Sequence, residues 1–209
     1  MNIDHICFGV LSSDQIRAIS VCEVVTSELY ENGSPKHGGL RDPRFGVASR
    51  RGQCTACDKT WSECSGHFGH YELPCPVFHV GWMTEVLQWL RRSCVCGYVS
   101  PTPLKKKCPE CNAVPAKFSK KNAISLTIQD DKGVRVLTAS VAYKRLMQIP
   151  QDNVAAFRTT KDQFHPSWLI LTVLPIPPNC VRPSPTVDGD EVRGEDDITR
   201  QLLYVCLVY

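Results

Sequence analysis

The chain has 209 residues, of which 43% are hydrophobic, so it can bury a sizeable core as one large domain or two small ones. Its formal net charge is only +3, which excludes bulk electrostatic attraction as the basis of nucleic-acid binding and leaves local patches. No apolar run is long enough to span a membrane and no signal-peptide pattern opens the chain, so we expect a soluble protein that is not secreted.

The first 50 residues predict a short helix, a strand and two loops. Ser12 followed three residues later by Gln15 is a capping-box pattern, so a helix is expected to begin there. The β-branched residues of segment 20–25 predict a strand. Segments 30–39 and 42–46 are rich in glycine, proline and asparagine or aspartate, and they predict a loop and a turn.

Cysteine and histidine pairs between residues 54 and 67 have the spacing of a zinc site. Cys54 and Cys57 are separated by two residues, and so are Cys64 and His67, so each pair can bind one tetrahedral Zn²⁺ from a tight turn. Three thiolates and one imidazole make a closed structural site. Unrelated buried thiols or disulfides are the alternative, which this spacing disfavours.

The 12 cysteines are concentrated in close pairs, which fits metal binding in a reducing compartment better than a disulfide scaffold. A second zinc site is predicted from Cys94, Cys96, Cys108 and Cys111, although the first of these pairs has a one-residue gap where two residues are usual. The cysteines outside the pairs are interpreted as small buried hydrophobic residues. They are Cys7, Cys22, Cys75, Cys180 and Cys206.

The middle of the chain predicts two helices and a hairpin. Segment 80–92 has apolar residues at helical spacing and ends in two arginines, which indicates a packing helix rather than a platform for stacking bases. The alternating segment 124–128, after several lysines, predicts a basic-edged hairpin with a turn near 131–133. A second helix is expected from a Ser140 cap to about Gln148. Its core-facing residues are expected to be Tyr143, Leu146 and Met147.

The C-terminal part combines an apolar strand with a proline-rich loop. The continuous apolar run 168–174 predicts a fully buried strand, and the prolines of 175–185 predict a stiff, extended segment. Asp188 and Asp190 resemble a pair of Mg²⁺ ligands, but carboxylates in such a loop are more often turn residues, and no other catalytic motif is found. The apolar segment 202–209 is not expected to be exposed at a terminus.

Several strings identify a family by their joint occurrence in this order. They are Phe8-Gly-Val-Leu-Ser with Ile16-Arg-Ala-Ile-Ser-Val, Gly39-Leu-Arg-Asp-Pro-Arg-Phe-Gly46, Cys64-Ser-Gly-His-Phe-Gly-His70, Pro76-Val-Phe-His79, His165-Pro-Ser-Trp-Leu-Ile-Leu-Thr-Val-Leu-Pro175, Val181-Arg-Pro-Ser184 and Arg193-Gly-Glu-Asp-Asp197. Over nearly its full length the chain resembles the N-terminal part of the largest subunit of multisubunit DNA-directed RNA polymerases, of the eukaryotic RNA polymerase II type.

The resemblance implies that the chain forms the clamp, the mobile jaw over the DNA cleft, with zinc sites near its base. It assigns Cys54, Cys57, Cys64 and His67 to one zinc, and Cys108 and Cys111 to half of the second, whose other half is usually Cys-x-x-Cys and here is Cys94-Val-Cys96. Segment 26–38 corresponds to the zipper loop and segment 180–195 to the lid loop, both at the upstream edge of the RNA–DNA hybrid. The family's Mg²⁺-binding Asn-Ala-Asp-Phe-Asp-Gly-Asp string is absent from this chain, so Mg²⁺ is expected only in a catalytic partner chain.

We therefore expect a zinc-stabilised α+β fold, an irregular clamp-core region with two zinc sites, short helices and small antiparallel sheets. Four segments are predicted: 1–50 with the zipper-like loop, 51–112 with both zinc sites, 113–178 with the buried strand, and 179–209 with the lid-like loop and the start of a clamp helix. The candidates for nucleic-acid contacts are arginines near these loops. They are Arg44, Arg50, Arg51, Arg182 and Arg193.

The expected function is a non-catalytic portion of an RNA polymerase largest subunit that closes over DNA and the RNA–DNA hybrid. Its partners would be the rest of the largest subunit, the second-largest subunit and smaller subunits, with template DNA and the RNA–DNA hybrid. The expected location is inside the cell, in the nucleus or, for a split subunit of a large DNA virus, in the host cytoplasm or viral factory and in the virion. The chain is interpreted as either such a split subunit or a truncated reading frame. The alternatives are a free-standing zinc module that binds protein or nucleic acid, and a zinc hydrolase using His70 or His79, which a closed four-ligand site disfavours.

Overall fold

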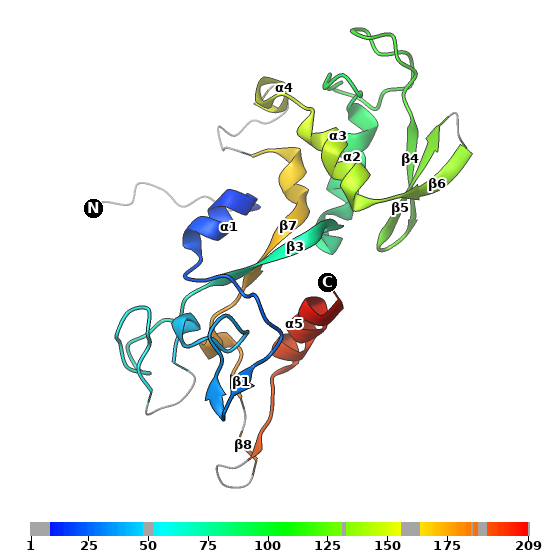
Figure 1. The fold of residues 1–209 in the computed structure, drawn as a ribbon. Helices are drawn as coiled ribbons and strands as arrows, with labels where there is room; N and C mark the ends of the chain where they lie inside the picture. The colour runs from blue at the N-terminus through cyan, green and yellow to red at the C-terminus, as the bar shows by residue number, and fades with distance from the viewer. Residues whose placement is uncertain are drawn as a thin grey trace. The chain divides into compact units, whose positions relative to one another are not determined.

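The structure is a computed structural model of the chain, and it describes residues 9–47, 52–130, 133–155, 164–184, 186–187 and 192–208. As expected, the fold is α+β, with short helices and small antiparallel sheets (Figure 1). It divides into two compact units: unit 1 comprises Met1–Ser12 and Cys75–Thr172, and unit 2 comprises Ser13–Pro74 and Val173–Tyr209. None of the helices in the described ranges is long and apolar enough to cross a membrane.

Two longer strands pair with each other, and the boundary between the units falls within both of them. They are β3 (Gly69–Phe78) and β7 (Ile170–Ile176). The apolar run predicted a fully buried strand over 168–174. Instead, β7 starts at Ile170, follows the 3₁₀ turn η3 (Pro166–Leu169), and buries every third residue only. Pro166 at the first position of that turn favours the helical conformation and delays the strand.

Unit 2 is built from short elements that frame one small core. They are α1 (Ser13–Ile19), β1 (Tyr30–Glu31), β2 (Ser34–Pro35), η1 (Pro43–Phe45), η4 (Asn179–Val181), β8 (Thr186–Val187), β9 (Val192–Arg193) and α5 (Asp197–Val208), with the start of β3 and the end of β7. The core contains Cys22, Val24, Leu40, Phe45, Ile176 and Leu202. Gly69 lies directly against Phe45, where a Cβ would collide with the aromatic ring, so the strand start and the core require glycine at this position.

The N-terminal predictions for unit 2 are partly confirmed. A helix begins at Ser13 as expected. The predicted strand 20–25 is wrong, because only Glu23 forms a bridge, a parallel one to His70. Segment 30–39 is not a plain loop: β1 and β2 form a hairpin whose turn residues Asn32 and Gly33 have φ of 51° and 77°. Two successive positive φ angles are the signature of a type I′ hairpin, which Asn-Gly favours.

Unit 1 packs helices against a three-stranded antiparallel meander. Its elements are η2 (Val80–Trp82), α2 (Met83–Arg92), β4 (Lys117–Asn122), β5 (Ser125–Asp130), β6 (Gly133–Leu137), α3 (Ala139–Met147) and α4 (Gln151–Ala155). Figure 1 shows α2 and α3 beside one another, and α2 packs against β4 as well. The shared core of these elements includes Val86, Leu90, Phe118, Leu126 and Leu146. The helix predicted over 80–92 is therefore a packing helix, as expected.

Details of the unit 1 predictions are corrected by local geometry. The predicted strand start at Ile124 is wrong, since this side chain is 66% exposed in the turn between β4 and β5. Thr138, not Ser140, caps α3, because its hydroxyl accepts the backbone N–H of Val141. Leu146 is buried and Tyr143 packs against the core, but Met147 is 52% exposed, so its predicted core position is wrong.

The cysteines outside the predicted zinc pairs are not all buried. Cys22 is buried and Cys206 is partly buried, as expected, but Cys75 and Cys180 are exposed, so the prediction is wrong for these two. Cys7 lies outside the described residues. Within this chain, α5 buries Leu202 but leaves Tyr204 at 62%, Leu207 at 66% and Val208 at 76% exposure, so the expectation that another polypeptide covers the apolar C-terminus stays a prediction.

Candidate metal centres and the buried charge network

The first predicted zinc set comes together in unit 2. Cys54, Cys57, Cys64 and His67 each place a ligand atom within 4.8 Å of the others. Cys54 is buried and the other three are partly buried. Two tight turns produce this arrangement. In the first turn, the N–H of Asp58 donates a hydrogen bond to the carbonyl of Cys54. The second turn depends on Gly66, whose φ of 81° is favourable for glycine.

Distances within this cluster fit a tetrahedral metal and not a disulfide. Cys57 Sγ lies 3.6 Å from Cys64 Sγ, and Cys64 Sγ lies 3.6 Å from His67 Nε2. A tetrahedron with Zn–S bonds of about 2.3 Å has S–S edges of about 3.8 Å and S–N edges of about 3.6 Å. A disulfide would need sulfurs about 2 Å apart. The ligands therefore fit one Zn²⁺, with His67 binding through Nε2.

The second predicted set, Cys94, Cys96, Cys108 and Cys111, also comes together, in unit 1. Cys94 Sγ lies 3.4 Å from Cys111 Sγ, and Cys96 Sγ lies 3.7 Å from Cys108 Sγ, again near the edge length of a tetrahedral Zn²⁺ site. The one-residue gap between Cys94 and Cys96 thus does not prevent convergence. Gly97, with φ of 90°, makes the return turn.

Packing explains why glycine follows the shortened pair. A Cβ on Gly97 would collide with the carbonyl oxygen of Gln148 and approach Pro150 Cδ to 3.0 Å. The Gly97 carbonyl also accepts a hydrogen bond from the side chain of Asn153 at 3.2 Å. The knuckle is therefore held against the end of α3 and the start of α4, in a position that leaves no room for a side chain on Gly97.

The thiolate is the form of cysteine that binds a metal, and in each cluster one thiol has a lowered pKa while other thiols have a raised one. Burial raises the pKa of Cys64, but the N–H of Gly66 and the neighbouring thiols outweigh it, so the net pKa is lowered. For Cys108 burial likewise raises the pKa, and the backbone N–H groups of Cys111 and Glu110 with the nearby thiols lower it to about 7. Each cluster thus contains at least one thiol predisposed to ionise.

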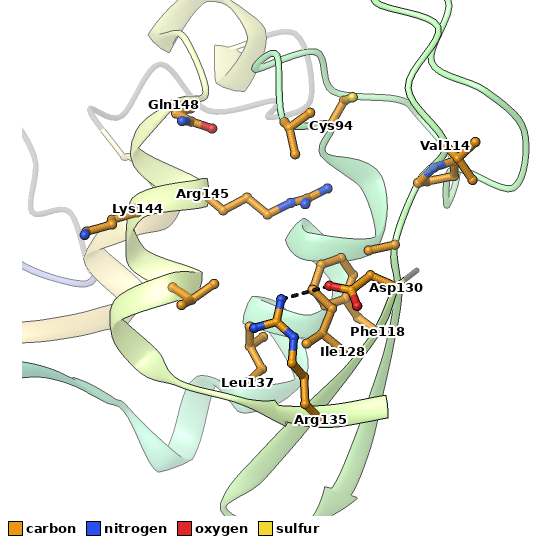
Figure 2. Close-up of a pocket in the computed structure, with 14 residues that line it drawn as sticks. Cys94, Val114, Phe118, Ile128, Asp130, Arg135, Leu137, Lys144, Arg145 and Gln148 are labelled. Atoms are coloured by element: carbon orange, nitrogen blue, oxygen red, sulfur yellow. Dashed lines mark hydrogen bonds and ion pairs between the residues drawn. The ribbon is translucent and has the colours of Figure 1, made fainter. Parts of the chain in front are cut away.

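Arg145 of α3 lies beside the second cluster. Its Nη2 donates to the Ser93 carbonyl at 2.8 Å, and its guanidinium lies 5.0 Å from the centroid of the Phe118 ring. Burial lowers the pKa of Arg145, and the thiols of Cys94 and Cys96 partly offset this effect. Figure 2 shows the side chain extending from α3 toward Cys94, along a mostly apolar pocket of about 410 Å³. Arg145 therefore links α3 to Ser93, the residue that directly precedes Cys94 of the second cluster.

The nucleic-acid candidates have different places. Arg182 is fully buried: its guanidinium donates to the carbonyls of Pro177 and Leu40, to Thr199 Oγ1 and to Asn179 Oδ1. It is not available to a phosphate, so its predicted role is corrected to a structural one. Arg44 is on the surface, with a side chain 38% exposed and paired with Asp42 at 2.7 Å. Arg50, Arg51 and the side chain of Arg193 lie outside the described residues.

The sequence did not predict the charged network to which Arg182 belongs. Arg41, 1% exposed, donates from Nη1 to the Arg182 carbonyl and from Nε and Nη2 to Glu195 at 2.9 and 2.5 Å. Burial and the neighbouring Arg41 lower the pKa of Arg182 to about 10. The sequence contains only a weak signal for this network. Both arginines lie in the strings shared with the family, but membership of such a string does not distinguish a buried arginine from one on the surface.

Asp42 holds the loop beside this network. Its Oδ2 accepts the N–H of Gly38 at 2.6 Å, and Oδ1 accepts the N–H of Arg44 at 2.9 Å. Burial raises the pKa of Asp42, but the hydrogen bonds from Arg44 and Gly38 outweigh it and leave the pKa below its usual value. Asn179 Nδ2 also donates to the Asp42 carbonyl at 3.2 Å, so this residue joins two distant parts of unit 2.

We expect Asp42→Asn to destabilise unit 2 by about 2 kcal/mol at neutral pH, because charge-assisted hydrogen bonds are lost. A carboxyl with a depressed folded pKa contributes stability above its unfolded pKa, and this contribution is lost as pH falls through the folded pKa. The difference between wild type and variant should therefore be constant above about pH 5 and shrink below about pH 4. Urea unfolding followed by amide exchange in unit 2 measures it, and a difference that grows in acid would contradict the assignment.

Comparison with known proteins gives one consistent result. The family described as RNA polymerase Rpb1, domain 1 matches residues 1–106 and 102–207. Among curated relatives, the DNA-directed RNA polymerase subunit Rpo1N of Methanothermobacter thermautotrophicus is 35% identical over 234 residues, covering 96% of this chain and 26% of the relative. The subunit of the same name from Sulfolobus acidocaldarius is 32% identical over 231 residues, covering 94% and 26%.

The chain therefore spans only about a quarter of the length of these relatives, and its own activity and partners do not follow from their names. The match nevertheless runs through both metal clusters and the buried arginine network. On this basis the chain belongs to the RNA polymerase Rpb1 domain 1 family and is an N-terminal domain of an RNA polymerase largest subunit.

Proposed function

We propose that this domain is a zinc-stapled, non-catalytic clamp portion of a DNA-directed RNA polymerase. The observation that carries the proposal is the family match over residues 1–207 together with two four-ligand clusters. In this role the domain closes over duplex DNA and the RNA–DNA hybrid, mainly through backbone phosphates, so that binding depends on salt more than on sequence. Mg²⁺ chemistry belongs to a partner polypeptide, and the zinc ions supply only structure.

Two hairpins of unit 2 fit the loops expected at the edge of the hybrid. The hairpin of β1 and β2 lies in segment 26–38, which we assign as the zipper-like loop. Its base is closed by hydrogen bonds from the N–H groups of Val25 and Thr26 to the Gly38 carbonyl. The β8–β9 pair lies in segment 180–195, which we assign as the lid-like loop. Arg44, Arg50, Arg51 and Arg193 remain the proposed phosphate contacts.

The exposed face of α5 supports a partner in the polymerase. Tyr204, Leu207 and Val208 are each more than 60% exposed on this one helix. Apolar clusters of this kind mark interaction sites in soluble proteins. We assign the face to contacts with the remaining largest-subunit polypeptide, alongside the second-largest and smaller subunits. That the polymerase is of the eukaryotic RNA polymerase II type, and that the subunit is split and viral, are finer parts of the same proposal.

Native co-purification tests the proposal. A tagged chain expressed in its own host should bring down the second-largest subunit and the polypeptide with the Mg²⁺-binding string, and their intact masses identify the polymerase type and any split of the subunit. Leu207→Glu should reduce the capture, whereas Val134→Glu, at an exposed position of β6, should not. Capture of neither polypeptide, with the chain a monodisperse monomer, would instead support a free-standing zinc module.

A further inference from the structure

Three hydrogen bonds converge on the carboxylate of Glu195. Tyr30 Oη donates to Oε1 at 2.9 Å, and Arg41 donates to Oε2 from Nε at 2.9 Å and from Nη2 at 2.5 Å. The Glu195 side chain is only 15% exposed and that of Arg41 only 1%. These groups are 165 and 154 residues apart from Glu195 in the sequence, so the contacts join distant segments of unit 2.

The donors and the acceptor belong to the two hairpins or to the residues that hold them. Tyr30 is the first residue of β1, in the hairpin formed by β1 and β2 (the first hairpin). Glu195 follows β9 and Arg182 precedes β8, so they stand at the two ends of the β8–β9 hairpin (the second hairpin). Arg41 bonds to both of these ends, through the Glu195 carboxylate and the Arg182 carbonyl.

The residue next to Arg41 holds the base of the first hairpin. Asp42 accepts the N–H of Gly38 at 2.6 Å, and Gly38 closes the hairpin by accepting from Val25 and Thr26. Gly39 is packed so tightly that a Cβ would collide with the Glu28 carbonyl. The two consecutive buried residues thus hold one hairpin each, Arg41 the second and Asp42 the first. In addition, Tyr30 of the first hairpin donates a hydrogen bond directly to Glu195 at the end of the second.

We propose that Glu195 is a positioning residue that links the two hairpins, so that loosening either one loosens the other. The physical reason is that each donor stabilises this largely buried carboxylate, and withdrawing one weakens the hold of the rest. Arg41 has an ion pair with Glu195 at 2.5 Å and with no other carboxylate in the described part of the chain. Movement of the second hairpin that withdraws Glu195 therefore leaves Tyr30 and Arg41 without their shared acceptor.

Linkage between two sites is reciprocal, which gives the proposal a sharp test. Amide hydrogen exchange is measured by mass spectrometry on the full zinc-loaded chain. Glu195→Gln should speed exchange in the first hairpin, at residues 28–36, by about tenfold, because neutralising the carboxylate weakens its charge-assisted hydrogen bonds with Tyr30 and Arg41. Tyr30→Phe, which removes one hydroxyl, should speed exchange at residues 192–196 by a smaller factor of about three.

Controls separate linkage from general destabilisation. Glu31→Gln is the control within the first hairpin. The Glu31 side chain is 64% exposed, and its carboxylate lies 4.0 Å from Lys36 Nζ. This substitution should leave the exchange rates at residues 192–196 unchanged. The effects of Tyr30→Phe and Glu195→Gln on exchange at residues 28–36 should be less than additive in the double variant, since both substitutions weaken the same Tyr30–Glu195 contact. Equal acceleration throughout unit 2, including α5, or a Tyr30→Phe effect confined to its own hairpin, would overturn the proposal.

The linkage rests on contacts within unit 2 and does not depend on the polymerase assignment. Exchange rates are read from the chain itself, whereas the assignment is tested by co-purification. If the polymerase subunits fail to co-purify but exchange in the two hairpins remains reciprocal, only the proposed function is lost. If the subunits co-purify and reciprocity is absent, only the linkage is lost.

Discussion

Replacing Cys64 by serine is expected to release zinc from the first cluster and unfold the segment around residues 52–69. Cys64 lies 3.6 Å from both Cys57 Sγ and His67 Nε2, so its loss leaves an incomplete ligand set. Binding energies of structural zinc are of the order of 10–16 kcal/mol and act directly as folding energy. The zinc-binding energy is thus as large as the whole stability of a typical domain, about 5–15 kcal/mol. The remaining contacts are therefore not expected to keep this segment folded without zinc.

Metal analysis and circular dichroism on the same sample check this result. A strong chelator added to the wild type should remove both zinc ions and cause a larger spectral change than the variant, which loses only the ion of the first cluster. Cys75→Ser is the matched control, because Cys75 is exposed and lies outside both clusters, and it should retain both ions. A metal-free Cys64→Ser protein with the wild-type spectrum would show that the cluster is not a structural zinc site.

The second large effect is expected from Arg182→Met, which should destabilise unit 2 by about 3–5 kcal/mol. Methionine fills much of the volume but donates no hydrogen bond. The carbonyls of Pro177 and Leu40 and the side chains of Thr199 and Asn179 then lose a buried donor. Relief of repulsion from Arg41, which helps lower the pKa of Arg182, offsets only a part of this cost.

Urea unfolding, read separately for each unit by amide exchange, measures the Arg182→Met effect, since two units need not unfold together. Arg200→Met is the control: this arginine lies on an exposed position of α5, and its replacement should change stability by less than about 0.5 kcal/mol. If Arg182→Met behaved like the control, the buried network would not contribute to the free energy of unfolding of unit 2. The structural role of Arg182 would then be wrong, and it would again be a candidate for nucleic-acid contact.

Local patterns in the sequence predicted the parts of this structure that depend on neighbours in the chain. Ligand spacing identified both metal clusters because a knuckle needs only a few consecutive residues. Apolar spacing likewise predicted the packing helix that became α2. The composition around Asn32-Gly33 predicts only a loop, but this dipeptide is also the strongest short hairpin signal, and it forms a hairpin here.

The failures have a tertiary origin. Segment 20–25 is rich in β-branched residues, yet it has only a single bridge, from Glu23 to His70, among the described residues. Strand propensity requires a partner edge, and composition does not show whether one exists. The buried positions of Arg41 and Arg182 are a stronger case, because arginine is rarely buried unless paired, and the pairing residue Glu195 is more than 150 positions from Arg41. Such contacts cannot be predicted from periodicity.

The division of unit 2 into two sequence segments has a consequence for synthesis of the protein. Its first segment, Ser13–Pro74, leaves the ribosome before the whole of Cys75–Thr172, and its second segment, Val173–Tyr209, follows that stretch. At about 5–20 residues per second, the intervening stretch of roughly 100 residues delays completion of unit 2 by about 5–20 s. Cys54, Cys57, Cys64 and His67 all lie in the early segment, so a metal ion can bind there before Arg182 and Glu195 have been translated. The zinc concentration during translation would then determine whether segment Ser13–Pro74 is already partly folded before the rest of unit 2 is synthesised, or stays unfolded and accessible to chaperones and proteases.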